Sequence, residues 1–312
     1  NNIYQYSVKW KSGNIPSDYL KQFCNDVYTS LSKIILAEIE NEKSIGEDAQ
    51  EIKQHKDFID KNYSDVVGRD REIQLVRDYI ENSTSQEPFV IIGESGSGKS
   101  SFMLRSAWDS IRNYPSEQFL FRFIGLTPNS LSSEKLLYSI ILDLAESFNV
   151  PIKLKSRNLS LLQVEFHRLL DLIPKGELLI VHIDAIDRLS SYGDRIPEWI
   201  PTKLPSRVKL ILSGTPQCFN SEFLGKIPES NRLILPKLSS FSAESILNNL
   251  LAKQQRKLQD FQQKIVLDNY AQVGLPIYLS IAAAEAAQWR SSQTDISLKS
   301  DISGIINQVL DS

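Results

Sequence analysis

The segment Gly93–Ser100, which reads GESGSGKS, constrains this chain more than any other. It matches the phosphate-binding loop pattern G-x-x-x-x-G-K-[ST] at every fixed position. Glycines let the backbone fold closely around a phosphate chain with its N–H groups turned inward. The pattern predicts that Lys99 reaches the β- and γ-phosphates, as a catalytic residue, and that the Ser100 hydroxyl is a ligand of Mg²⁺. The loop residues expected to bind a nucleoside triphosphate are Gly93, Glu94, Ser95, Gly96, Ser97, Gly98, Lys99, Ser100 and Ser101.

The segments on either side of this loop support the prediction. The apolar run Phe89–Ile92 before it is typical of a buried strand. After it, Phe102, Leu104, Trp108 and Ile111 recur at roughly helical spacing. A strand, loop and helix in this order place the phosphates at a helix N-terminus. A glycine-rich turn that matches by accident is the alternative, and this context disfavours it.

The composition is that of an ordinary folded protein. With 312 residues, 41% hydrophobic and 23% charged, the chain is long enough for one large or two modest domains. The net charge of −3 favours neither nucleic acid nor an anionic membrane as a partner. Cys24 and Cys218 are isolated, so neither a disulfide framework nor a zinc site is predicted and a reducing, cytoplasmic location is expected.

The first 60 residues differ from the rest of the chain. Apolar and polar residues alternate from Tyr4 to Trp10, as in a half-buried strand. A helix with one apolar face should follow, and the charged stretch Glu38–Asp65 should be a linker or an exposed helix, in which Glu38–Glu51 is either a solvated linker or a hinge. One strand and one helix cannot close a core, so we expect the end of a preceding domain or a brace packed on the next one. The residues of the expected apolar face are Leu20, Phe23, Val27, Leu31 and Ile34.

No signal peptide or membrane-spanning run is recognisable. The chain begins with Asn rather than Met, and we expect it to be a piece of a longer protein.

From about residue 61 to 238, strand-like and helix-like runs alternate. This alternation predicts a three-layer α/β/α domain with a parallel five-stranded sheet. The expected strands are Phe89–Ile92, Phe119–Ile124, Leu178–Ile183, Val208–Leu212 and Leu233–Leu235. The expected helices are Arg71–Glu81, Lys99–Ile111, Ser133–Phe148 and Leu161–Leu172. Residues 239–312 have helical periodicity throughout, which predicts a small all-helical domain.

An acidic residue ends one of these expected strands and supplies a second half of the nucleotide site. Leu178–Asp184 is an apolar run whose last residue is predicted to hold Mg²⁺, through water or Ser100. Asp187 is predicted to orient the attacking water. The alternatives are that Asp184 caps a turn and Asp187 is solvated. Arg188 is either a phosphate contact or a surface charge.

The expected strand Val208–Leu212 should lie between the acid-tipped strand and the strand before the phosphate-binding loop. It is followed by Ser213 and Thr215. In P-loop ATPases with such an inserted strand, a polar residue at this point contacts the γ-phosphate. Ser213 and Thr215 are therefore candidate sensor residues, and a simple turn is the alternative.

Two further motifs resemble those of a known family. Val66–Ile73, which reads VVGRDREI, looks like the "hhGRxxEh" box that precedes the P-loop in STAND ATPases. These are signal-transducing relatives of AAA+ proteins and include the NACHT and NB-ARC groups. The resemblance implies that Val67, Gly68 and Arg69 lie along the adenine. Gly274-Leu275-Pro276 is similar to the GLP motif of the family's helical lid, which implies that Pro276 packs on the base.

The resemblance also implies a domain arrangement. Phe121–Pro128 resembles the second strand of the telomerase-associated and nephrocystin-like subgroup. There, the stretch that resembles Ile296–Asp311 leads into a winged helix. The implied domains are 1–60, the end of an N-terminal effector or recognition domain with a linker; 61–238, the nucleotide-binding domain; and 239–312, the helical lid.

The chain departs from the family pattern at two places. NACHT and NB-ARC proteins commonly have an Arg where this chain has Thr215, and NACHT proteins often have Asp-Glu where it has Asp187-Arg188. Slow hydrolysis, or hydrolysis that needs a residue from a neighbouring subunit, is the expected consequence.

The resemblance implies an ATP-hydrolysing switch that uses ATP/ADP and Mg²⁺. It would couple nucleotide state to conformational change and self-association in signalling, innate immunity or antiphage defence. A flanking effector and a flanking sensor domain are expected partners, and nucleic acid and membrane are not.

Two other classes of P-loop protein are the alternatives. An AAA+ ATPase acting on DNA, an initiator or loader, would need a basic groove or winged helix, whereas acids outnumber bases 38 to 35. A metabolic P-loop kinase would need a phosphoacceptor site. The basic stretch Lys253–Lys257 is interpreted as a solvated helix face. Trp108, Trp199 and Trp289 are interpreted as packing residues.

Overall fold

The computed structural model describes residues 17–44, 46–62, 66–82, 84–189 and 195–311. The chain divides into two compact units, residues 1–50 and 51–312. The first unit contains the long helix α1 (Ser17–Ser44), on which the predicted apolar-face residues Leu20, Phe23, Val27 and Leu31 are exposed. The predicted strand at Tyr4–Trp10 falls outside the described residues. Among the helices described, none is long and apolar enough to cross a membrane.

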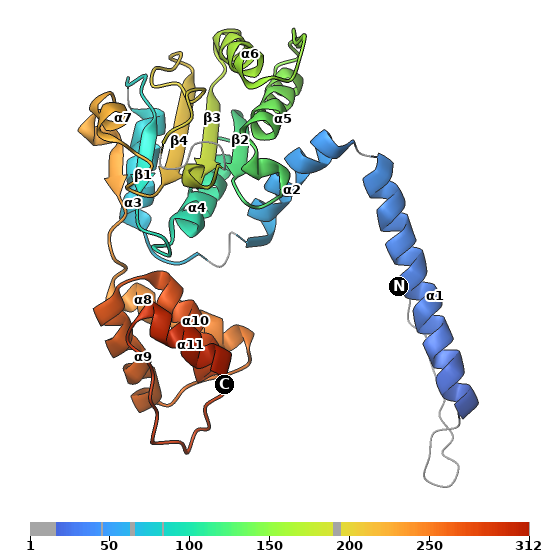
Figure 1. Ribbon diagram of the computed structural model, residues 1–312, viewed down its shortest axis with the longest axis vertical. Coiled ribbons are helices and arrows are strands. Elements are labelled where there is room, and N and C mark those ends of the chain that lie inside the picture. The colour runs from blue at the N-terminus through green and yellow to red at the C-terminus, as the bar shows by residue number, and fades with distance from the viewer. Residues whose placement is uncertain (1–16, 45, 63–65, 83, 190–194, 312) are drawn as a thin grey trace. The chain divides into compact units, whose positions relative to one another are not determined.

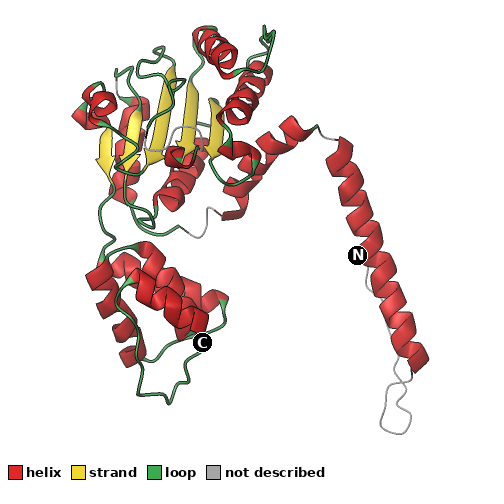
Figure 2. Ribbon diagram, in the orientation of Figure 1, coloured by secondary structure: helices red, strands yellow, loops and turns green. Residues whose placement is uncertain are grey.

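The second unit contains a five-stranded parallel sheet (Figures 1 and 2). Its order is β2-β3-β4-β1-β5. The strand after the acid-tipped one thus lies between that strand and the P-loop strand, which confirms the prediction, and the predicted strand ends are correct within two residues. The strands are β1 (Phe89–Ile92), β2 (Gln118–Phe123), β3 (Leu179–Asp184), β4 (Val208–Gly214) and β5 (Arg232–Ile234).

Helices cover both faces of the sheet. Successive strand side chains point to opposite faces, and each face has its own apolar cluster. Val90 and Ile92 join α5 and α6 in one cluster, whereas Phe89 and Ile91 join α3 and α4 in the other. The predicted α/β/α layering is therefore confirmed. The helices are α3 (Asp70–Glu81), α4 (Lys99–Asn113), α5 (Ser133–Ser147), α6 (Leu159–Asp171) and the short α7 (Ser221–Gly225).

The helix α2 (Glu47–Asn62) differs from the prediction of a linker or exposed helix over Glu38–Asp65. From residue 51 onward it belongs to the second compact unit, and Ile52, His55 and Ile59 are buried. The charged sequence of α2 suggests an exposed helix, but the polar residues Glu51 and His55 are buried together with the apolar ones. Residues 51–62 therefore fit the alternative of a brace packed on the following domain.

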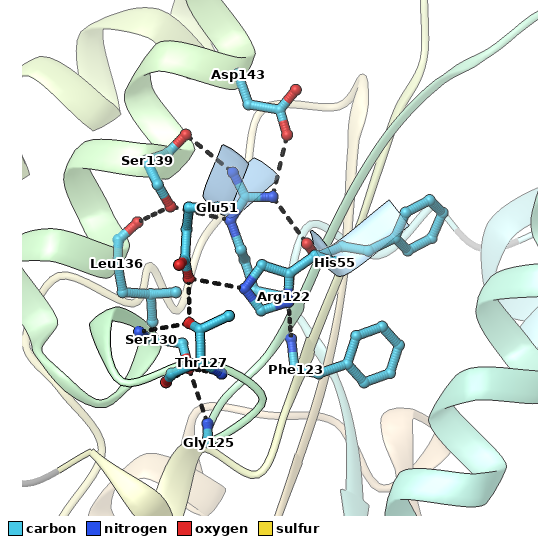
Figure 3. A network of polar contacts seen from close by, with 11 residues as sticks. Glu51, His55, Arg122, Phe123, Gly125, Thr127, Ser130, Leu136, Ser139 and Asp143 are labelled. Atoms are coloured by element: carbon cyan, nitrogen blue, oxygen red, sulfur yellow. Dashed lines mark hydrogen bonds and ion pairs between the residues drawn. The ribbon is translucent and has the colours of Figure 1, made fainter. Parts of the chain in front are cut away.

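Polar side chains fix this part of α2 to the loop that follows β2 (Figure 3). Thr127 Oγ1 donates to Glu51 Oε1 at 2.6 Å, and the same carboxylate oxygen lies 3.1 Å from His55 Nε2. The Phe123 backbone N–H donates to His55 Nδ1 at 3.1 Å. Since Nδ1 accepts this bond, the proton is assigned to Nε2, which donates to Glu51. The ring is neutral, and burial lowers the pKa of His55.

A buried ion pair lies beside this network. Arg122 of β2 donates from Nη1 to Asp143 Oδ2 of α5 at 3.0 Å and from Nη2 to the Ser139 carbonyl at 2.9 Å. The Arg122 side chain is fully buried. Lys56 of α2 also reaches Asp143 Oδ1 at 3.4 Å, so the pair contributes to the attachment of α2.

The C-terminal part of the second unit is helical, as predicted. Its helices are α8 (Ser240–Lys253), α9 (Asp260–Val273), α10 (Pro276–Ala286) and α11 (Ile302–Asp311). They enclose an apolar cluster of their own, in which Leu247, Val266, Leu279 and Ile305 are fully buried. Trp199 and Trp289 are also buried, in the sheet domain and in this helical part respectively.

His182 makes the stability of the sheet domain depend on pH. It lies in β3 with Nε2 3.0 Å from Ser106 Oγ, and burial lowers its pKa to about 3. The unfolded chain binds a proton at this residue near pH 6.5, whereas the folded chain does not. Its stabilising contribution is therefore complete above pH 6.5 and is lost as the pH falls below it.

Between pH 7.5 and 5.5 we expect His182 to account for a loss of about 1–2 kcal/mol in the free energy of unfolding. Urea denaturation at both pH values measures this loss. The variant His182→Gln should lack it, and an identical pH dependence of the two proteins would contradict the assignment.

Candidate functional site

A cavity of about 500 Å³ lies in the second unit, bordered by the P-loop, the turn after β3 and the helices α8 and α10. It brings together most of the site residues predicted from the sequence. Those that line it are Val67, Arg69, Ser95, Gly96, Ser97, Gly98, Lys99, Ser100, Ser101, Asp187, Thr215 and Pro276. The other predicted residues, Gly68, Gly93, Glu94, Asp184 and Ser213, do not line it.

The P-loop connects β1 to the N-terminus of α4. Gly96 and Gly98 have φ angles of +78° and +88°, a backbone conformation that favours glycine. Lys99 Nζ donates to the carbonyls of Gly93 and Glu94 at 2.6 and 2.9 Å, so its ammonium lies over the start of the loop. Burial lowers the pKa of Lys99, and the negative charges of Asp187 and Asp184 oppose this effect.

Asp184 lies at the carboxyl end of β3 and is only 3% exposed. The Ser213 hydroxyl donates to Asp184 Oδ1 and accepts the Ala185 N–H at 2.9 Å. Ser213, a predicted sensor candidate, is therefore turned toward the carboxylate. Burial raises the pKa of Asp184, and hydrogen bonds from Ser100 and Ser213 counteract it.

Asp187 reaches the cavity because the chain turns sharply after β3. Ala185 has a φ of +57° and leads into the 3-10 turn Ile186–Arg188. The Thr215 backbone N–H donates to Asp187 Oδ1 at 3.2 Å, which ties the ends of β3 and β4 together. The second sensor candidate, Thr215, thus lines the cavity next to the acid predicted to orient water.

Arg69 connects three segments of the site. Its Nη1 donates to the Pro236 carbonyl, just before the helical part, and its Nη2 donates to the Ser97 carbonyl of the P-loop at 3.3 Å. The neighbouring Gly68 has a φ of +78°, and a Cβ added there would lie 2.7 Å from Ser242 Oγ of α8. A glycine is therefore required where the box packs on the lid.

The first turn of α10 contacts the P-loop directly. The Ile277 N–H donates to the Gly96 carbonyl at 3.2 Å. Pro276 Cγ lies 3.6 Å from the position of a Cβ added at Gly98. The motif Gly274-Leu275-Pro276 explains this placement locally, because Gly274 ends α9 with a φ of +72° and Pro276 occupies the first turn of α10.

Some residues that line the cavity were missed by the sequence interpretation. Lys253, interpreted as part of a solvated helix face, borders the cavity together with Ile246 and Leu250. The spacing of these three residues puts them on one face of α8, which is a signal the sequence contained. Arg188, left open between two roles, lines the cavity beside Asp187.

These residues fit a nucleotide with its magnesium ion. The P-loop glycines leave room for a phosphate chain, and Lys99 supplies a positive charge. The Ser100 hydroxyl bonds to the Asp184 carboxylate, so two hard oxygen donors of the type Mg²⁺ prefers lie together. When bound, the ion would neutralise charge on the phosphates.

Comparisons with known proteins agree with a nucleotide-binding site. The NACHT domain family matches residues 87–264. The chain is 25% identical over 301 residues to NACHT domain- and WD repeat-containing protein 1 of Mus musculus, covering 90% of this chain and 19% of that protein. It is 25% identical over 206 residues to telomerase protein component 1 of Rattus norvegicus, covering 62% of this chain and 8% of that protein.

Among solved structures, a Walker-type ATPase of Pyrococcus abyssi aligns with a TM-score of 0.46 and 13% identity, covering 80% of this chain and 72% of that one. The chain spans about a fifth of the length of its NACHT and WD-repeat relative. The family match covers more than half of the chain and includes the P-loop, Asp184 and the first lid helix. The chain belongs to the NACHT family of P-loop NTPases.

Proposed function

We propose that this NACHT domain is an ATP-dependent switch. Residues 61–238 bind ATP or ADP with Mg²⁺, and residues 239–312 form a lid that responds to the bound nucleotide. The response alters self-association in a signalling or defence protein that carries flanking effector and sensor domains. The long multidomain relatives support such flanking domains. A cytoplasmic location is part of this proposal.

The contact of Ile277 with Gly96 carries the proposal. A ligand shifts an equilibrium between two conformations only if it interacts differently with each. Gly96 belongs to the loop expected to wrap the phosphates, and Ile277 belongs to the lid. A rearrangement of the loop therefore acts directly on the lid.

Hydrolysis would reset the switch. In this scheme Lys99 binds the phosphates, Ser100 and Asp184 hold Mg²⁺, and Asp187 orients the attacking water. Arg188 replaces the second acid that NACHT proteins often have at this place, which supports slow turnover. Slow turnover suits a switch, because each nucleotide state then persists long enough to be read.

The identity of the nucleotide that the purified chain retains tests the proposal. The chain is denatured, and the released nucleotide is identified by chromatography. We expect about one ADP per chain, followed by a larger assembly in light scattering after exchange to a non-hydrolysable ATP analogue. An empty protein that turns ATP over rapidly, or turnover stimulated by DNA, would instead support a motor or a DNA-acting AAA+ ATPase.

A substitution in the lid tests its contact with the P-loop. Ile277→Ala removes the side chain that lies against Gly96, and we expect ADP affinity to fall about five-fold, as for about 1 kcal/mol of lost apolar contact. Ile306→Ala in α11 is a matched control, since the two residues are 42% and 40% exposed and Ile306 does not line the cavity. Isothermal titration measures both, and equal affinities of the two variants would contradict the lid's role.

A further inference from the structure

Arg188 lines the nucleotide cavity, and the family pattern assigns it no role. We propose that Arg188 contacts the terminal phosphate of ATP from within the same chain, and that its packing on Gly125 transmits this contact to α2. The inference rests on the proposed function. In this scheme Arg188 distinguishes ATP from ADP, and α2 is the element that responds.

The position of Arg188 places it at the phosphate end of the site. It is the last residue of the turn that follows β3, next to Asp187, and its backbone N–H donates to the Ala185 carbonyl at 2.9 Å. Burial has the largest effect on the pKa of Lys99 and of Asp184, lowering the first and raising the second, and the positive charge of Arg188 lies close enough to act on both. A guanidinium stays charged and matches phosphate oxygens with two parallel donors.

The Arg188 guanidinium lies over the end of β2. A Cβ added to Gly125 would be 3.1 Å from Arg188 Nη1 and 3.4 Å from its Cδ. Gly125 has a φ of +89°, so this close approach also depends on glycine. Arg188 thus borders the cavity, and its guanidinium packs on the loop that follows β2.

A short hydrogen-bonded path continues from this loop to α2 (Figure 3). The Gly125 N–H donates to Ser130 Oγ at 2.9 Å, and the Ser130 N–H donates to Thr127 Oγ1 at 3.1 Å. Thr127 Oγ1 donates to Glu51 Oε1 of α2 at 2.6 Å. Gly125 is exposed, but Ser130, Thr127 and Glu51 are buried, so movement of the guanidinium changes the support of a network that begins at the surface and continues into the interior.

Nucleotide state determines where the guanidinium is held. The γ-phosphate of ATP adds negative charge beside Asp187 and attracts Arg188 away from Gly125. With ADP this attraction is absent, and the guanidinium stays packed on the loop. The loop after β2, and through it α2, therefore has different support in the two states.

The inference is tested with wild type, the variants Arg188→Gln and Thr127→Val, and a control variant. Titrations with ATPγS and ADP measure nucleotide preference, and amide hydrogen exchange over residues 51–62 measures the response of α2. We expect Arg188→Gln to weaken ATPγS binding by about 10- to 100-fold, and ADP binding much less. Its α2 exchange should be the same with either nucleotide. Arg290→Gln, at an exposed arginine that does not line the cavity and lies outside the motifs of the site, is the matched control and should behave as wild type.

Thr127→Val separates the two steps. It should keep the wild-type preference for ATPγS but lose the nucleotide dependence of α2 exchange. An unchanged ratio of ATPγS to ADP affinity in Arg188→Gln would overturn the phosphate contact. Equal α2 exchange in wild type with both nucleotides would overturn the transmission to α2. A wild-type protein that binds neither nucleotide would overturn the proposed function and this inference with it.

Discussion

Replacing Lys99 with alanine is expected to lower the affinity for ATP by about 100- to 10,000-fold, and the affinity for ADP by a smaller factor because ADP lacks the γ-phosphate. Lys99 is 9% exposed, and its ammonium lies over the loop at the carbonyls of Gly93 and Glu94. Charge-assisted hydrogen bonds contribute about 1.5–3 kcal/mol each, so the loss of two to the phosphates gives a change of this size. Titration with a fluorescent nucleotide measures it.

The matched control is Lys226→Ala. Lys226 is an exposed lysine that pairs with Glu222 on α7 and does not line the cavity, so its removal should leave nucleotide affinity unchanged. Lys99→Ala should also unfold at a urea concentration close to that of the wild type, because burial already disfavours the Lys99 charge. Wild-type affinity in a folded Lys99→Ala protein would mean that the nucleotide binds elsewhere.

Asp143→Ala is expected to lower the free energy of unfolding by about 3–5 kcal/mol. The Arg122 guanidinium is buried, and burial lowers its pKa while Asp143 opposes this effect. Without the carboxylate, a charged group stays in the interior with carbonyl and hydroxyl partners, and it loses the acid that it contacts directly, while Glu51 still acts on its charge. Lys56 of α2 loses the same partner. Urea denaturation followed by far-UV circular dichroism measures the change.

A second Arg–Asp pair calibrates this result. Arg77 Nε donates to Asp109 Oδ2 at 2.7 Å, but the Arg77 side chain is 35% exposed. Asp109 itself is buried and accepts two bonds from Arg77, but the guanidinium left behind can reach water, so Asp109→Ala should cost about 1–2 kcal/mol. The double variant Arg122→Met/Asp143→Leu should recover part of the stability lost in Asp143→Ala, because it removes both buried charges. Equal losses for Asp143→Ala and Asp109→Ala would contradict the role given to burial.

The sheet and the P-loop could be predicted because their signals are local. Apolar runs such as Phe89–Ile92 and Leu178–Asp184 are continuous where a parallel strand is buried on both faces. The fixed residues of the loop follow from the shape of a phosphate chain. The place of β4 between β3 and β1 was predicted from P-loop ATPases that have an inserted strand there. The pairing of β4 with both β3 and β1 agrees with that prediction.

The contacts that join distant segments could not be predicted. The polar residues Glu51 and His55 suggest that α2 is exposed. The sequence pattern does not show that Glu51 bonds to Thr127 and that His55 bonds to Glu51 and to the Phe123 N–H in the interior. The bond from Ile277 to Gly96 uses backbone atoms, which carry no residue-specific signal. The packing of Arg188 on Gly125 likewise depends on how β2 and β3 end side by side.

The strand order also has a consequence for the order in which this domain can be completed. β2 and β3 pair with each other, but β1 pairs only with β4 and β5 among the described strands. A chain that has emerged as far as residue 207 therefore contains the P-loop sequence on a strand with neither neighbour. Its backbone groups remain unpaired until residues 208–214 and 232–234 are added, and such non-local parallel pairing is slow. The loop gains a fixed shape late, so tight nucleotide binding is a property of the finished sheet and not of a growing chain.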